Sequence, residues 1–484
     1  MYLIWADKSV SPFVVLLGVV CNLSSQPMLK FYTTYLPYFR KTLALSYPIV
    51  IGQLGIVLMG VADIVMIGKL DAVNLAAASL ANSIFFLIAI LGIGTLSAIS
   101  PLVAKSKAEG HTNAVAILFR QGIWAAILMA LAISTILFVL TLNLEWFGQT
   151  ERVTELTRNY LHILNAGLLP MLIFTAVKQF SDGLGYTKPS AIITFFALVL
   201  NVFLNWALIY GKFGMPVLGL FGAGIATSIS RLVMAILMFA FVKTAPIYRN
   251  SLHLKQHDHD SQWLIQIFKI GLPSGFQYFF EVGAFAFAAI MIGWMGELQM
   301  ASHQVAINIA SVTYMIATGL SAGGSIGVGD AYGRRNRIDI VRYGYAAMFL
   351  AIAFMGVCAL VFSLIPQIIV SWYTTQPEVL SMAGNLLIIA AVFQLSDGIQ
   401  CVGLGILRGL GDTQIPTLIT IIAYWVIGIP LGYYLGFYTG LQQNGVWISL
   451  SVGLSFSAIF LSLRFKLLSR AINLDHPSKA LHVN

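Results

Sequence analysis

Long apolar runs recur along the whole chain and constrain its fold more than any other feature. A helix needs about 20 consecutive, mostly apolar residues to cross a bilayer. Charged residues make up only 9% of the 484 residues, whereas soluble domains carry roughly 25%. The runs are too long and too little alternating for the strands of a membrane barrel. The sequence therefore predicts an all-α polytopic membrane protein with twelve transmembrane helices, near residues 43–68, 75–104, 119–142, 159–180, 190–210, 217–243, 265–293, 302–328, 342–365, 380–407, 415–437 and 444–468.

The positive charges are unevenly divided between the two faces of the expected membrane domain. The chain has 27 Lys and Arg residues and a formal charge of +9. Nearly all lie on the face that holds both termini, Arg231 lies within a span, and the other face holds only Lys69, Arg152, Arg158 and Lys212. Because Lys and Arg are enriched in cytoplasmic loops, we expect both termini in the cytoplasm. The charge is then a signal of topology, with some attraction to membrane lipids, and not a nucleic-acid-binding surface.

The segments outside the spans carry weaker signals. Residues 1–36 hold one apolar run, which is short for a span and closer to a signal-peptide core. Cleavage there would put the new amino terminus outside, against the charge distribution, so we expect a poorly structured leader with Met28 as an alternative start. The polar segment 244–262 contains three histidines, and we expect a solvated linker rather than a metal site: His253, His257 and His259. The three cysteines, Cys21, Cys358 and Cys401, form no disulfide or metal-binding pattern.

The two halves of the sequence correspond at a constant offset. The matched positions include prolines, glycines and small residues: Pro48 with Pro273, Met66–Gly68 with Met291–Gly293, Gly94 with Gly319 and Ser100 with Ser325. Further on, "DGLGYTKPS" from Asp182 resembles "RGLGDTQIPT" from Arg408. Each half has six spans, so both enter the membrane in the same direction, as in the parallel repeats of some transporters. We expect two six-helix bundles related by this repeat, 37–243 and 263–470, followed by a cytoplasmic tail at 471–484.

Three carboxylates lie inside the expected spans, out of 18 acidic residues in the chain. They are Asp63 in the first span, Glu281 in the seventh and Asp397 in the tenth. A charged side chain at the centre of a bilayer costs roughly 2.5–3.5 kcal/mol on insertion scales. The structural alternative is that each carboxyl stays protonated and bonds to its neighbours. The functional interpretation is that the three carboxyls bind a cation or exchange a proton, because burial disfavours the ionised form of an isolated carboxyl group.

Polar side chains accompany these carboxylates at helical spacing. Gln277 lies one turn before Glu281, and two further pairs, Gln304 with Asn308 and Asn201 with Asn205, are each four residues apart. Each pair either lines a binding pocket or joins neighbouring helices by hydrogen bonds. Arg231 is the only basic residue expected within a span, so the predicted pocket is acidic.

Three segments around the carboxylates resemble the multidrug and toxic-compound extrusion (MATE) family, most closely its bacterial multidrug-pump branch. They are "VADIVMIGKLDAVNLAAASLANSI" around Asp63, "FFEVGAFAFAAIMIGWMGELQMASHQVAIN" around Glu281 and "FQLSDGIQCVGLGILRGLGDTQIPT" around Asp397. The resemblance covers about residues 37 to 470. It implies two six-helix bundles in a V that opens alternately to each side of a bacterial inner membrane. It also implies a non-enzymatic, monomeric antiporter that exports organic, mostly cationic compounds in exchange for H⁺ or Na⁺, without a bound cofactor.

The resemblance also assigns roles to individual residues. The positions that match Glu281 and Asp397 contribute to the cation site of the second bundle, and Asp63 with Asn201 and Asn205 matches a polar cluster in the first. One position departs from the pattern: Phe393 stands where some Na⁺-coupled relatives have a tyrosine. A phenyl ring offers no oxygen to an ion, which weakens the case for Na⁺.

The sequence leaves two other functions as alternatives. A lipid-linked oligosaccharide flippase of a related fold would carry several basic residues in its cavity, where this sequence offers Arg231 alone. A membrane-embedded enzyme would need clustered His, Asp or Arg residues at one membrane face. The nearest candidate for such a cluster, "DAYGRRNRID" from Asp330, is typical of a cytoplasmic loop.

Overall fold

A computed structural model describes residues 26–249 and 261–471, and the regular elements in these ranges are all helices. Twelve segments are long and apolar enough to cross a membrane, so the twelve expected spans are confirmed. The linker histidines, Cys21 and residues 1–25 and 472–484 lie outside the described residues. The spans are formed by α2 (Gln26–Ile67), α3 (Ala72–Leu96) with α4 (Ile99–Ala108), α5 (Thr112–Leu142), α6 (Glu151–Ala166) with α7 (Leu168–Gly183), α8 (Lys188–Tyr210), α9 (Leu220–Thr244), α11 (Gln262–Gly293), α12 (Glu297–Gly333), α13 (Arg337–Leu364), α15 (Pro377–Gly409), α16 (Gln414–Ile421) with η2 (Ile422–Gly428) and α17 (Ile429–Tyr438), and α18 (Gln442–Ala471).

Short helices complete the chain: η1 (Leu144–Phe147) between α5 and α6, α10 (Pro246–Arg249) after α9, and α14 (Pro366–Ser371) between α13 and α15. Local sequence sets several of the helix ends. Asp71 caps α3, because its Oδ1 accepts a hydrogen bond from the amide of Asn74 at 2.7 Å. That amide holds the pKa of Asp71 below its ordinary value. Gly211 ends α8 with a φ of 65°, a left-handed conformation that glycine adopts without steric cost.

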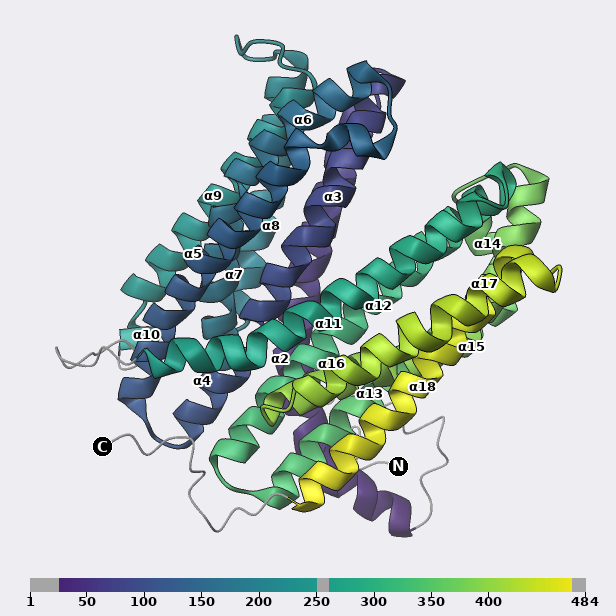
Figure 1. The fold of residues 1–484 in the computed structure, drawn as a ribbon. Helices are drawn as coiled ribbons and strands as arrows, with labels where there is room; N and C mark the ends of the chain where they lie inside the picture. The colour runs from purple at the N-terminus through teal and green to yellow at the C-terminus, as the bar shows by residue number, and fades with distance from the viewer. Residues whose placement is uncertain (1–25, 250–260, 472–484) are drawn as a thin grey trace, which may run out of the picture.

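The helices form two groups that meet near the beginning of α2 and the end of α18 and diverge toward the opposite face (Figure 1). The first group contains α3 to α9, and the second contains α12 to α18. Three helices contact both groups: α2 packs against α8 and α12, α11 packs against α3 and α16, and α12 of the second group packs against α4 of the first. The result is a V whose two arms are tied together by α2, α11 and the contact of α12 with α4.

The internal repeat appears in equivalent close contacts between helices. A Cβ atom built on Gly183 of α7 would lie 2.5 Å from the carbonyl oxygen of Ser100 in α4. A Cβ atom built on Gly409 of α15 would lie 2.7 Å from the carbonyl oxygen of Ser325 in α12. Any larger residue would force these helices apart, so glycine is required at both positions. The two glycines and the two serines correspond in the sequence repeat, which confirms the expected parallel arrangement.

The segment η2 is a π-helix in the middle of an otherwise α-helical span. Pro430 follows it and lacks the amide that would continue the α-helical hydrogen bonds, and π-helical turns often accompany such interruptions. Trp425 ties the segment to α11, because its Nε1 donates to the carbonyl of Phe280 at 2.9 Å. The neighbouring Tyr424 is fully buried, and its hydroxyl reaches the polar cluster described next.

Candidate functional site

Asp63 lies at the centre of a polar cluster formed by α2, α8 and α9. Its side chain is 6% exposed. Asn205 Nδ2 donates to its Oδ1 at 2.5 Å, and Thr227 Oγ1 donates to its Oδ2 at 2.7 Å. Asn201 is held one bond further away, since it accepts from Asn205 at 3.1 Å and donates to Thr227 at 3.3 Å. The structure therefore brings Asp63, Asn201 and Asn205 together, and it adds Thr227 to them.

A half-buried cation lies close to this first cluster. Arg231 of α9 lies over the ring of Phe85, 4.7 Å from its centre, and acts electrostatically on Asp63 and Tyr160. Two polar atoms here, Arg231 Nη1 and the Tyr160 hydroxyl, are buried without a hydrogen-bond partner in the part of the chain that the structure describes. Arg231 is therefore the nearby positive charge that balances Asp63, and it does not form a direct ion pair with that residue.

Glu281 lies at the centre of a second cluster, formed by α11, α12 and α15. Its side chain is 4% exposed. Three neutral groups donate to its carboxylate, each at 3.2 Å: Gln277 Nε2, the Tyr314 hydroxyl and Gln400 Nε2. Gln400 also donates to the hydroxyl of Tyr424 in η2 at 2.8 Å. The donors are all side-chain groups, and no ion pair with Glu281 forms among residues 26–249 and 261–471.

Asp397 lies within electrostatic reach of Glu281 and is 7% exposed. It accepts no hydrogen bond from any residue that the structure describes, so two carboxyl groups share this part of the second half with few polar partners. Phe393, one turn earlier on α15, is buried and packs against Trp447, with the two tilted rings 5.6 Å apart between centres. Its ring thus belongs to the apolar packing between α15 and α18.

The second predicted pair on α12 lies apart from this cluster. Gln304 and Asn308 are both exposed and make no hydrogen bond to Glu281 or Asp397. Their assignment to a binding pocket stays a prediction. Instead, α12 contributes Tyr314 to the cluster, a residue that the sequence reasoning did not select. Tyr314 is uncharged, and α12 contains other aromatic and polar residues. The sequence therefore does not distinguish Tyr314 as a partner of Glu281.

Two buried cations correct the expectation that Arg231 is the only basic residue within the spans. Arg408 is 5% exposed in the last turn of α15, where Nε donates to Ser274 Oγ at 3.1 Å and Nη2 donates to Gln277 Oε1 at 3.3 Å. Gln277 therefore connects Arg408 to Glu281. Lys178 forms a buried ion pair with Asp182 at 3.0 Å on α7. Both cations lie near the ends of spans, where hydropathy does not separate buried from solvated charges.

No group of three or more His, Cys, Asp or Glu residues within the described ranges is arranged to hold a metal ion. The chemistry available at the two clusters is the reversible binding of a proton or a small cation by carboxyl oxygens. Each cluster contains side chains from at least three helices. A proton or cation that binds there can therefore change how these helices pack.

Comparison with known proteins identifies the family. The family model MatE matches residues 48–207 and 273–434, one segment in each half of the repeat. The chain belongs to the MatE family. The "Probable multidrug resistance protein NorM" of Rhizobium meliloti is 34% identical over 442 residues, covering 90% of this chain and 95% of the relative. The "Multidrug resistance protein MdtK" of Photorhabdus laumondii is 33% identical over 437 residues, covering 89% of this chain and 95% of the relative.

A solved structure supports the fold of this MatE protein. The Vibrio cholerae MATE transporter VcmN has a TM-score of 0.82 with 19% sequence identity, over 91% of this chain and 99% of that one. The resemblance expected from the three sequence segments is confirmed. The chain is a multi-pass membrane protein of a transporter family with bacterial relatives, and it is not an enzyme.

Proposed function

We propose that this MatE protein is an antiporter that exports organic, mostly cationic compounds in exchange for H⁺ or Na⁺ by alternating access. Multidrug resistance proteins similar to it over most of the chain support the export of varied compounds. The observation that carries the proposal is the buried pair of Glu281 and Asp397: Glu281 accepts hydrogen bonds from three neutral donors, and Asp397 accepts none from the described residues. A proton or a cation that binds to such a pair stabilises its carboxylates, because no other positive charge is bonded to them.

Exchange follows from competition for these carboxyl groups. Two carboxylates in one buried site repel each other, so a proton or a cation that binds between them relieves that repulsion. A cationic compound and the coupling ion then exclude each other. A membrane potential of 100 mV supplies about 2.3 kcal/mol for each elementary charge moved, which is enough for a substantial concentration gradient.

Asp63 provides the second point of ion binding in the proposed mechanism. Both of its oxygens accept hydrogen bonds, from Asn205 and from Thr227. A proton on either oxygen would face one of these donors and displace it. Because the donors belong to α8 and α9 and Asp63 belongs to α2, proton uptake would loosen the packing of α2 against the first group of helices.

The coupling ion is proposed as H⁺ or Na⁺, with the chemistry at Phe393 favouring H⁺. Sodium prefers several oxygen ligands, and hard cations in general are held by oxygen. Phe393 supplies none at its position and packs on Trp447 instead. The carboxyl groups of Glu281 and Asp397 can each bind a proton directly, and a proton needs no additional oxygen ligands.

The proposed orientation follows from the distribution of Lys and Arg. With both termini in the cytoplasm of a bacterial cell, the arms of the V diverge toward the outside of the inner membrane (Figure 1). The structure would then correspond to the state that releases its substrate outward. The proposed active unit is one chain, since the clusters around Asp63 and Glu281 are each formed by residues of one chain.

The test uses purified protein in liposomes with an imposed pH or Na⁺ gradient and a fluorescent organic cation such as ethidium. We expect Glu281→Gln and Asp397→Asn each to abolish gradient-driven transport, because each removes a charge that must alternate between ion and substrate. Glu378→Gln, at an exposed carboxylate in the first turn of α15, is the matched control and should transport normally.

Undiminished transport by the Glu281→Gln/Asp397→Asn double variant would refute the proposed role of this pair. Failure of the unmodified protein to move any organic cation under either gradient would refute the antiporter proposal itself. In that case a fluorescently labelled lipid-linked sugar in the same liposomes would test the flippase alternative.

A further inference from the structure

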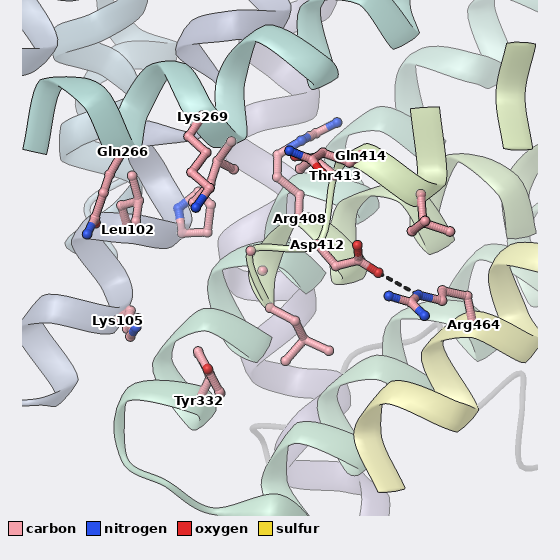
Figure 2. A pocket seen from close by; sticks show the side chains of 16 residues that line it. Leu102, Lys105, Gln266, Lys269, Tyr332, Arg408, Asp412, Thr413, Gln414 and Arg464 are labelled. Atoms are coloured by element: carbon pink, nitrogen blue, oxygen red, sulfur yellow. Dashed lines mark hydrogen bonds and ion pairs between the residues drawn. The ribbon is translucent and has the colours of Figure 1, made fainter. Parts of the chain in front are cut away.

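A cavity of about 430 Å³ lies between the two groups of helices, beside the beginning of α11 and the end of α15. It is formed by the end of α4, the beginning of α11, the end of α12, the turn between α15 and α16, and α18. Figure 2 shows the basic side chains of Lys105, Lys269, Arg408 and Arg464 around it, each from a different helix. The volume is within the range of sites that hold small molecules or headgroups.

The positive charge of the cavity exceeds what its carboxylates neutralise. Arg464 is paired with Asp412, the one acidic residue of the lining, at 2.8 Å. Lys105 has a longer ion pair with Glu109, at 3.8 Å. Lys269 and Arg408 have no ion-pair partner among the residues that the structure describes. Lys269 thus faces the cavity without a counter-charge, and Arg408 reaches Glu281 only through Gln277, which leaves positive charge in the cavity for an anion.

The geometry of Arg408 supports the same conclusion. The side chain is 5% exposed, and its hydrogen bonds to Ser274 and Gln277 use Nε and Nη2. The guanidinium also lies over the ring of Tyr278, 5.4 Å from its centre, and Arg408 lines the cavity. A guanidinium has five N–H donors, so one that two hydrogen bonds and a ring hold in place is a preorganised partner for phosphate oxygens.

The cavity also includes a helix amino terminus. Thr413 and Gln414, at the beginning of α16, are part of its lining. The Thr413 side chain makes no capping hydrogen bond to the first turn, so the first amides of α16 are not satisfied in that way. Amides at a helix amino terminus favour anions, and phosphate in particular.

We propose that this cavity binds a phosphate-bearing anion, either the headgroup of an anionic phospholipid or free phosphate. The site lies at the ends of the membrane spans, where headgroups are found, and basic pockets between transmembrane helices bind such headgroups. Because Lys105 belongs to the first group of helices and Arg408 and Arg464 to the second, the bound anion bridges them. It therefore stabilises the arrangement in which α4 of the first group is in contact with α12 of the second.

The experiment measures the thermal unfolding midpoint of the delipidated full-length protein in detergent micelles. One arm adds phosphatidylglycerol, with phosphatidylcholine as its reference. The other arm adds sodium phosphate, with sodium chloride at equal ionic strength as its reference. The variant is Lys269→Gln, at an exposed position of α11, and the matched control is Lys466→Gln, at an exposed position of α18 outside the cavity lining.

We expect a saturable rise of the midpoint for the unmodified protein and for Lys466→Gln. We expect Lys269→Gln to raise the apparent Kd about tenfold, the loss typical of one charge-assisted hydrogen bond. A rise with phosphatidylglycerol alone identifies a lipid headgroup, and a rise with sodium phosphate alone identifies free phosphate. Should neither anion exceed its reference, or should both variants lose affinity equally, the proposal is wrong. Transport of organic cations plays no part in this assay, so it can fail or succeed independently of the proposed antiport.

Discussion

The hydrogen bond from Thr227 to Asp63 offers a direct test of the first cluster. Its length of 2.7 Å is within the range of O–H donors to ionised carboxylates. Asn201 donates to the same hydroxyl oxygen, so the hydrogen of Thr227 is free to point at Asp63. The Thr227→Val substitution removes this donor and keeps the branched shape of the side chain.

The size of the effect depends on the charge of Asp63. A hydrogen bond to a charged acceptor contributes about 1.5–3 kcal/mol, and one between neutral groups contributes about 0.5–1.5 kcal/mol. Thr227→Val also leaves Asn201 without an acceptor, so the single substitution overstates the bond. The cycle of Thr227→Val, Asp63→Asn and the double variant isolates the pair, and we expect a coupling energy of about 2 kcal/mol at pH 8.

The assay is equilibrium unfolding in mixed micelles titrated with sodium dodecyl sulfate, with the free energy of unfolding measured for all four proteins. Thr135→Val is the control for hydroxyl removal, because Thr135 donates only to the carbonyl of Leu131 in its own helix, at 2.8 Å. Its coupling to Asp63→Asn should be near zero. A coupling below about 0.5 kcal/mol at pH 8 would refute the assignment of Thr227 as a donor to a charged carboxylate.

Two further predictions concern packing and buried charge. Gly183→Ala and Gly409→Ala should each lower the free energy of unfolding by about 1–3 kcal/mol, because the added methyl groups overlap a carbonyl of the facing helix. Gly60→Ala, where an added Cβ meets no atom within 4 Å, should be neutral or stabilising, and equal losses at all three positions would contradict the reasoning. Lys178→Met should cost about 3–5 kcal/mol by leaving Asp182 buried without its partner, and Lys178→Met/Asp182→Leu should recover part of that loss. The same micelle titration measures both, and a double variant no more stable than Lys178→Met would show that the pair itself is not the source of the loss.

Much of the fold was predictable because one physical requirement dominates it. A bilayer demands long apolar helices whatever their partners, so the twelve spans follow from hydropathy alone. The repeat was predictable from matched prolines and glycines, such as Pro48 with Pro273 and Gly94 with Gly319. Prolines restrict the backbone and glycines permit close helix contacts, so a match at these positions is informative. The burial of Asp63 and Glu281 was predictable because each of these carboxyl groups lies inside a long apolar run.

The partners of those carboxylates were harder to predict. Tyr314, Gln400 and Thr227 are uncharged, and their role depends on which face each helix turns toward the others. Only Gln400 carried a usable signal, since it lies three residues after Asp397 and therefore on the same helix face. Arg408 was assigned to the aqueous face because it follows the apolar run of α15 directly, and hydropathy cannot tell a buried charge from a solvated one at the end of a span.

The path of α11 has a consequence for how the chain is assembled. Gly271 and Gly275 of α11 lie against Thr95 and Leu91 of α3, so α11 covers part of the first group of helices. During synthesis, α3 enters the membrane long before α11 emerges from the ribosome. This face of α3 must therefore wait in contact with lipid or with the insertion machinery until the chain has been extended by well over a hundred residues. The first half cannot complete its packing by itself, and a protein cut at the linker would have to assemble from two fragments that each lack a helix surface supplied by the other.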